Sequence, residues 1–116
     1  MLLILAHHDF KVDILLGLMR RISDLDTATP REVGMEEASD PELLAWAAEA
    51  EHIILTHDRK TLPMHAADRM AAGERVAGVI VVPRPWSSEH AIDQLELILL
   101  CTDTSDWRNV VCTLPL

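Results

Sequence analysis

Three aspartates stand where strand-like or helix-like stretches begin or end. Asp9 lies just beyond the apolar run 2–6, Asp58 lies one residue beyond the strand-like run 52–56, and Asp40 opens a helical stretch. Clustered carboxylates repel one another unless cations lie between them, and oxygen-rich clusters favour Mg²⁺ or Mn²⁺, which also bind phosphate oxygens. Such an ion polarises a phosphodiester and lowers the pKa of a bound water. If the three side chains meet, they predict a metal site for phosphodiester chemistry.

Each aspartate also has a structural interpretation that the sequence leaves open. Asp9 is placed to cap the helix that follows it, and Asp40 is placed to cap its own helix, alone or beside Ser39. Asp58 is placed to close an Asx-type turn after its strand. In these interpretations the carboxylates bind backbone N–H groups of the same chain segment and leave no site for an ion.

Basic and imidazole side chains adjoin these aspartates in the sequence. Arg59 and Lys60 come directly after Asp58, where they either contact a phosphate backbone or are ordinary solvated charges. His7 and His8 come between the first apolar run and Asp9. They are either metal ligands or histidines that lie at the surface or form hydrogen bonds.

The elements that must position these residues alternate between strand and helix patterns. Continuous apolar runs indicate buried parallel strands, and apolar residues at i, i+3, i+4 and i+7 indicate amphipathic helices. We expect strands at 2–6, 26–30, 52–56, 76–82 and 109–114, with helices at 10–22, from Ser39 onward, at 62–72 and from Ser87 or Ser88 onward. This alternation predicts one α/β domain, 1–116, with a mostly parallel sheet of about five strands flanked by helices.

In sheets of this kind, ligands bind beyond the carboxyl ends of the strands, where the strand order reverses. Asp9 and Asp58 both follow predicted strands, and Asp40 opens the helix between them. We therefore expect the three aspartates to lie at one edge of the sheet.

Composition and charge narrow the functional classes. The 116 residues carry a net charge of −9, which argues against a broad basic face that grips duplex DNA. No apolar run approaches the roughly 18 residues of a membrane helix, and the first apolar run is too short for a signal peptide. Cys101 and Cys112 lie in apolar stretches, so we expect two buried, reduced thiols, although one disulfide is the alternative. A cytoplasmic protein without a membrane partner is the expectation.

Three segments together resemble the compact PIN-like domain family, a branch related to the nuclease toxins of toxin–antitoxin systems. They are Glu32–Gly34 (EVG), Ala38–Ala47 (ASDPELLAWA) and Ile53–Asp58 (IILTHD). The resemblance continues through Val79–Pro83 (VIVVP) to the closing Leu114–Leu116 (LPL). It therefore covers essentially the whole chain.

The resemblance implies a metal-dependent endoribonuclease that hydrolyses single-stranded RNA with a metal-activated water. Asp40 and Asp58 would bind Mg²⁺ or Mn²⁺ or orient metal-bound water, and the Thr56 hydroxyl would support the pocket. With Arg59 and Lys60, Thr56 completes the set expected to contact substrate. The resemblance also implies a small antitoxin protein that blocks the pocket, and a homodimer is a further expectation.

One departure concerns the residues after the first strand. The family usually has Asp-Glu-Asn there, and this chain has His7, His8 and Asp9. His7 is then a substitute ligand that shifts metal preference, or Asp9 turns inward to replace the missing carboxylate. Region 82–86 has no clear counterpart of the family's fourth acidic position.

Two further hypotheses remain, and the first of them follows from this departure. The first is a catalytically degenerate PIN-like module that acts by binding a partner protein. The second is a receiver-type domain, which would need an acidic pair directly after the first strand, and the pair of His7 and His8 fits it poorly. The metal-dependent ribonuclease with Asp9, Asp40 and Asp58 is the leading expectation from sequence.

Overall fold

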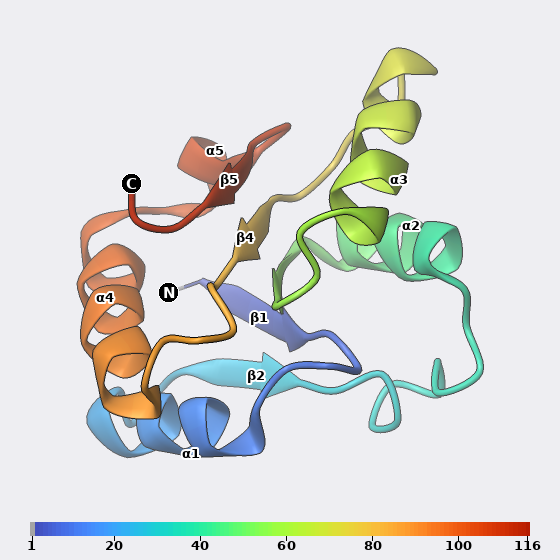
Figure 1. Cartoon of the computed structure of the whole chain (residues 1–116). Helices are drawn as coiled ribbons and strands as arrows, with labels where there is room; N and C mark the ends of the chain where they lie inside the picture. The colour runs from blue at the N-terminus through green and yellow to red at the C-terminus, as the bar shows by residue number, and fades with distance from the viewer. Residues whose placement is uncertain (1) are drawn as a thin grey trace.

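The computed structural model describes residues 2–116, in which strands and helices alternate along the chain (Figure 1). The elements are β1 (Leu3–Ala6), α1 (Val12–Arg21), β2 (Asp26–Ala28), α2 (Asp40–Ala50), β3 (His52–Thr56), α3 (Thr61–Ala71), β4 (Val79–Val81), α4 (Ser88–Cys101), α5 (Thr104–Trp107) and β5 (Val111–Thr113). The predicted sequence of strands and helices is confirmed, with the short α5 as an unpredicted addition.

All five strands are parallel, in the order β2-β1-β3-β4-β5. Strand β1 pairs on one side with the edge strand β2, where Leu3 is opposite Asp26, and on the other with the central strand β3, where Leu3 is opposite His52. The chain therefore moves outward from β1 to β2 and then crosses back to β3. This reversal between β1 and β3 is the point at which sheets of this kind bind ligands.

Helices cover both faces of the sheet, and each face has its own apolar core. Helices α1 and α4 pack side by side on one face, over Ile4 and Leu55, whereas α2 and α3 cover the other, over Leu5 and Ile54 (Figure 1). Successive residues of a strand point to opposite faces. Both kinds of residue must therefore be apolar, which explains the continuous apolar runs.

Local signals define the helix ends that matter for the site. Ser39 caps α2 in a capping box with Glu42, and Pro41 occupies the first turn. This arrangement confirms that Ser39 is the true cap, so the side chain of Asp40 is not needed for that role. Gly73, with φ of 81°, follows the end of α3, as the sequence predicts.

Several sequence expectations were wrong in detail. Lys11, not Asp9, is the N-cap of α1, and its side chain makes no cap hydrogen bond. Both cysteines are free, as expected, but Cys101 is exposed and Cys112 is half-buried, because α4 turns Cys101 toward solvent at its last residue. The strands predicted at 76–82 and 109–114 are shorter, since pairing is limited to Val79–Val81 and Val111–Thr113. No helix of residues 2–116 is both long and apolar enough to cross a bilayer.

Candidate functional site

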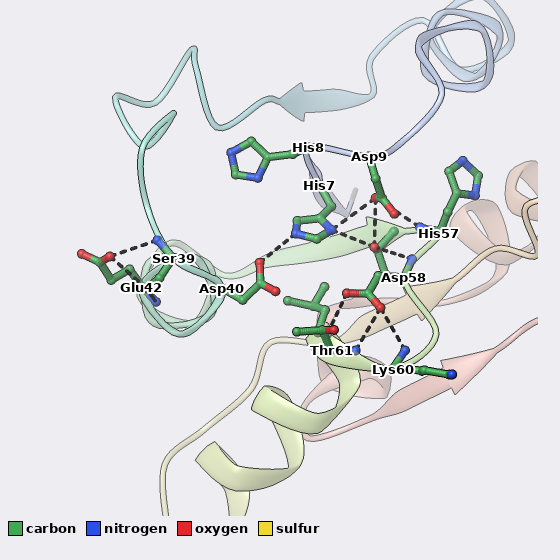
Figure 2. A network of polar contacts seen from close by, with 12 residues as sticks. His7, His8, Asp9, Ser39, Asp40, Glu42, His57, Asp58, Lys60 and Thr61 are labelled. Carbon is green, nitrogen blue, oxygen red and sulfur yellow. Dashed lines mark hydrogen bonds and ion pairs between the residues drawn. The ribbon is translucent and has the colours of Figure 1, made fainter.

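The predicted site residues lie near one another at the carboxyl ends of β1 and β3, where the strand order reverses. His7 and Asp9 follow β1, Asp40 is the first residue of α2, and Thr56 ends β3 (Figure 2). Asp58 lies in the turn between β3 and α3. The sequence therefore located this edge correctly, although the structure assigns the side chains different partners from those expected.

The imidazole of His7 lies between two carboxylates. Its Nε2 is 2.9 Å from Asp40 Oδ1, and its Nδ1 is 3.2 Å from Asp9 Oδ1 and 2.8 Å from Thr56 Oγ1. Figure 2 shows the ring between these groups, with His8 pointing away. His7 is only 8% exposed, so its two nitrogens depend on these partners rather than on water.

A count of hydrogens indicates that the ring of His7 is doubly protonated. The Thr56 hydroxyl donates its one proton to Asp9 Oδ1 at 3.1 Å and accepts the N–H of Asp58 at 3.0 Å. The Nδ1 of His7 must therefore donate to Thr56, while Nε2 must donate to the carboxylate of Asp40. Burial opposes this charge, but hydrogen bonds to Asp9 and Asp40 and the charges of both carboxylates outweigh it. The pKa of His7 is raised above its usual 6.5.

Asp9 is held ionised by groups from three directions. Besides His7 and Thr56, Oδ1 accepts the backbone N–H of His57 at 3.3 Å, and Oδ2 accepts Arg84 Nη2 at 3.2 Å. Burial would raise the pKa of this carboxyl, but the hydrogen bond from His7 and the other donors outweigh it. The pKa of Asp9 is lowered from 3.8 to about 2.

Asp58 uses both of its carboxylate oxygens to cap α3. Oδ1 accepts the N–H groups of Lys60 and Thr61, each at 2.9 Å, and Oδ2 accepts that of Leu62 at 3.0 Å (Figure 2). Although partial burial opposes ionisation, these three donors lower the pKa of Asp58 below its usual 3.8. The structural alternative that the sequence left open for this residue, a turn after the strand, is the one observed.

His57 is a central residue of this edge that the sequence analysis did not single out. Its Nδ1 donates to the carbonyl of Val82 at 2.9 Å, and its Nε2 accepts the backbone N–H of Lys11 at 3.2 Å. The ring stacks on Phe10, with centroids 4.7 Å apart. Burial lowers the pKa of His57, so the ring is neutral. Its hydrogen bonds join the β1–α1 loop to the ends of β3 and β4. Only its place directly after a buried strand could have drawn attention to it.

The basic residues expected to contact substrate lie at the rim. Arg59 and Lys60 are both exposed in the turn before α3. Figure 2 shows the side chain of Lys60 extending away from the carboxylate of Asp58. These residues lie near the site without forming part of the network around His7.

The imidazole of His7 lies between Asp9 and Asp40, where an ion bound by both carboxylates would have to lie. Mg²⁺ or Mn²⁺ shared by Asp9 and Asp40 would need an oxygen from each at about 2.1 Å. Instead, the imidazole ring of His7 separates these oxygens. Its Nδ1 is 3.2 Å from the Asp9 oxygen and its Nε2 is 2.9 Å from the Asp40 oxygen. Asp58 has both oxygens engaged in its cap. Within residues 2–116, no three His, Cys, Asp or Glu side chains are grouped to hold a metal.

The site's chemistry is therefore that of a closed charge network: one imidazolium, two carboxylates and a hydroxyl that satisfy one another. The positive charge of His7 offsets the negative charges of Asp9 and Asp40 in this network. No protein-family model, no curated protein and no solved structure matches this chain.

Proposed function

We propose that the protein is a PIN-like domain of the toxin-related branch that has lost metal-dependent catalysis and acts by binding a partner protein. One observation carries this proposal: His7 lies between Asp9 and Asp40 with both ring nitrogens engaged. In this position the imidazolium provides the positive charge that two facing carboxylates require. A bound cation is then unnecessary for the stability of the pocket.

Charge favours a protein partner over RNA for such a pocket. The chain has a net charge of −9, and without a bridging ion the acidic pocket repels phosphates. A basic protein segment is attracted by the same charges. A small antitoxin-like protein, as implied by the family resemblance, is the partner class we propose.

The second candidate is the metal-dependent cleavage of single-stranded RNA. The observation in its favour is the convergence of Asp9, Asp40 and Thr56 from three elements at the reversal between β1 and β3. Mg²⁺ or Mn²⁺, when bound, would supply an activated water for phosphodiester hydrolysis. Arg59 and Lys60 at the rim would then be available to contact the RNA backbone.

Mn²⁺ calorimetry and an RNA-cleavage assay separate the two candidates. We expect no Mn²⁺-dependent cleavage by the wild type, because His7 occupies the space between the carboxylates. His7→Asp replaces the internal cation with a third carboxylate and should raise Mn²⁺ affinity by about tenfold or more. His8→Asp adds a carboxylate at the neighbouring exposed position and should not do so.

The ribonuclease candidate makes the opposite prediction for the wild type. Wild-type protein that binds Mn²⁺ and cleaves RNA, with activity abolished by Asp58→Asn, would overturn the proposed function. The Asp58→Asn variant also excludes a contaminating nuclease as the source of activity. Cleavage gained only in His7→Asp would support a degenerate site.

A further inference from the structure

An apolar cavity adjoins the charge network on the side of β2. It has a volume of about 200 Å³, and its apolar walls include Phe10, Val12, Leu15 and Pro30, with His7 on another side. Pockets for drug-sized ligands usually enclose about 300–1,000 Å³. This cavity is smaller and suits a single large apolar side chain.

An acidic cavity shares part of its wall with the apolar one. Its volume is about 410 Å³, and it has Arg31 and Glu36 in common with its neighbour, while Glu37 and Glu42 complete its negative lining. The backbone N–H of Ser39 lowers the pKa of Glu42 and keeps it charged. Within residues 2–116, the side chains of Glu36 and Glu37 form no ion pair, so their charges face solvent.

An exposed apolar stripe on α1 leads away from the apolar cavity. Val12, Leu16 and Met19, at i, i+4 and i+7, lie on one helix face with exposures of 64%, 43% and 43%. Met19 Sδ accepts the Thr27 hydroxyl at 3.6 Å, which places the stripe on the side of α1 nearest β2. Val12 belongs to both the stripe and the cavity wall. Apolar side chains exposed together on one helix face offer surface for a partner.

We propose that the two cavities and this stripe, together the docking surface, bind a segment of a partner protein that carries a large apolar side chain close to a lysine or arginine. The apolar side chain occupies the cavity beside His7, and the basic side chain pairs with Glu36, Glu37 or Glu42. Charge complementarity favours a basic protein segment over an RNA strand, because these glutamates would repel the phosphates of RNA. This inference rests on the proposed function and specifies its partner.

The test uses a short acetylated peptide with a central leucine flanked by arginines, titrated into ¹⁵N-labelled full-length protein and followed by NMR. We expect shifts of amides around Val12 and Glu37. Val12→Lys should weaken binding about tenfold or more, since it removes apolar contact and adds like charge. Glu37→Lys should weaken it roughly twofold to fivefold, as a rim charge does.

Matched variants control for exposure and charge. Leu97→Lys changes an apolar residue of equal exposure on α4, 63% against 64% for Val12, and should leave binding unchanged. Glu49→Lys reverses a charge on the exposed face of α2, away from both cavities, and should also have no effect. A peptide with glutamates in place of the arginines should bind more weakly.

Other results would overturn the inference. No peptide shifts up to the solubility limit, equal loss in Leu97→Lys, or equal binding of the acidic peptide would each do so. Shifts at this surface from nucleoside monophosphates but not from the peptide would identify an RNA site, and dimerisation abolished by Val12→Lys would identify a second copy as the occupant. None of these results involves a metal, so RNA cleavage by the wild type would overturn the proposed function separately.

Discussion

Strands β1 and β3 are each followed by a buried histidine, and the pKa values of the two histidines are shifted in opposite directions. His7 directly follows β1 and His57 directly follows β3, with exposures of 8% and 4%. An aspartate comes soon after each, Asp9 in one case and Asp58 in the other. The pKa of His7 is raised, whereas that of His57 is lowered.

The partners of each ring account for the difference. Nε2 of His7 donates to Asp40, and Nδ1 donates to Thr56 with the Asp9 carboxylate 3.2 Å away, so a second proton is stabilised. His57 binds one backbone carbonyl and one backbone N–H, which require a neutral ring with one donor and one acceptor. Similar positions in the sheet thus produce an ionic bridge after β1 and a structural link after β3.

The largest expected effect is the loss of the link after β3. His57→Ala removes the stacking on Phe10 and two hydrogen bonds, and leaves the N–H of Lys11 without its partner. We expect a loss of about 3 kcal/mol in the free energy of unfolding, measured with urea. His8→Ala, at an exposed position, is the control and should change it by less than about 0.5 kcal/mol. An equal change in both variants would contradict the structural role of His57.

Removal of the ionic bridge should cost somewhat less. His7→Gln keeps a polar group but removes the cation between the two carboxylates, which leaves Asp9 with Arg84 alone and Asp40 without its partner, so we expect a loss of about 2 kcal/mol near neutral pH. Urea unfolding measures it. His7→Lys is the informative companion variant, because it restores a charge without the planar ring. If His7→Gln is as stable as the wild type, the bridge contributes nothing and the contrast with His57 fails.

Asp58 tests whether the carboxylate after β3 is a cap or a site residue. Asp58→Ala removes the acceptor of three N–H groups at the start of α3 and should cost about 1 kcal/mol in urea unfolding. Asp58→Asn retains a capping oxygen and should cost only a few tenths of that. A stable Asp58→Ala variant would argue against the cap.

The smallest effect is a pH dependence with opposite signs for the two rings. Because the folded pKa of His7 is raised, its stabilisation is fully present below 6.5 and is lost as the pH rises through the folded value. For His57, whose pKa is lowered, the stabilisation is present above 6.5 and is lost as the pH falls. The stability difference between wild type and His7→Gln, measured by urea unfolding at several pH values, should therefore shrink as the pH rises above 6.5.

NMR titration of the imidazole protons measures the two rings directly. The resonances of His7 should titrate above 6.5 and those of His57 below it. If the pKa values of His7 and His57 both lay on the same side of 6.5, the contrast between the ionic bridge of His7 and the structural link of His57 would fail.

Much of the fold was predictable because its signals are local. The strand at 52–56, the capping box at Ser39 and the stop at Gly73 each depend on neighbouring residues, and all were found. The alternation of elements then limits the topology to a parallel sheet. Strand ends and α5 were missed, since sheet pairing and the packing of Trp107 involve distant segments.

The sequence by itself determined where the polar site lies. Asp9 and Asp58 follow parallel strands and Asp40 begins the helix between them, so their position at one edge of the sheet was predicted correctly without coordinates. Only the tertiary structure decided what those residues do. His7 and Asp40 are 33 positions apart in the chain, and Asp58 turns its oxygens to α3 instead. A side chain's charge depends on the groups that surround it in space, and no local pattern specifies them.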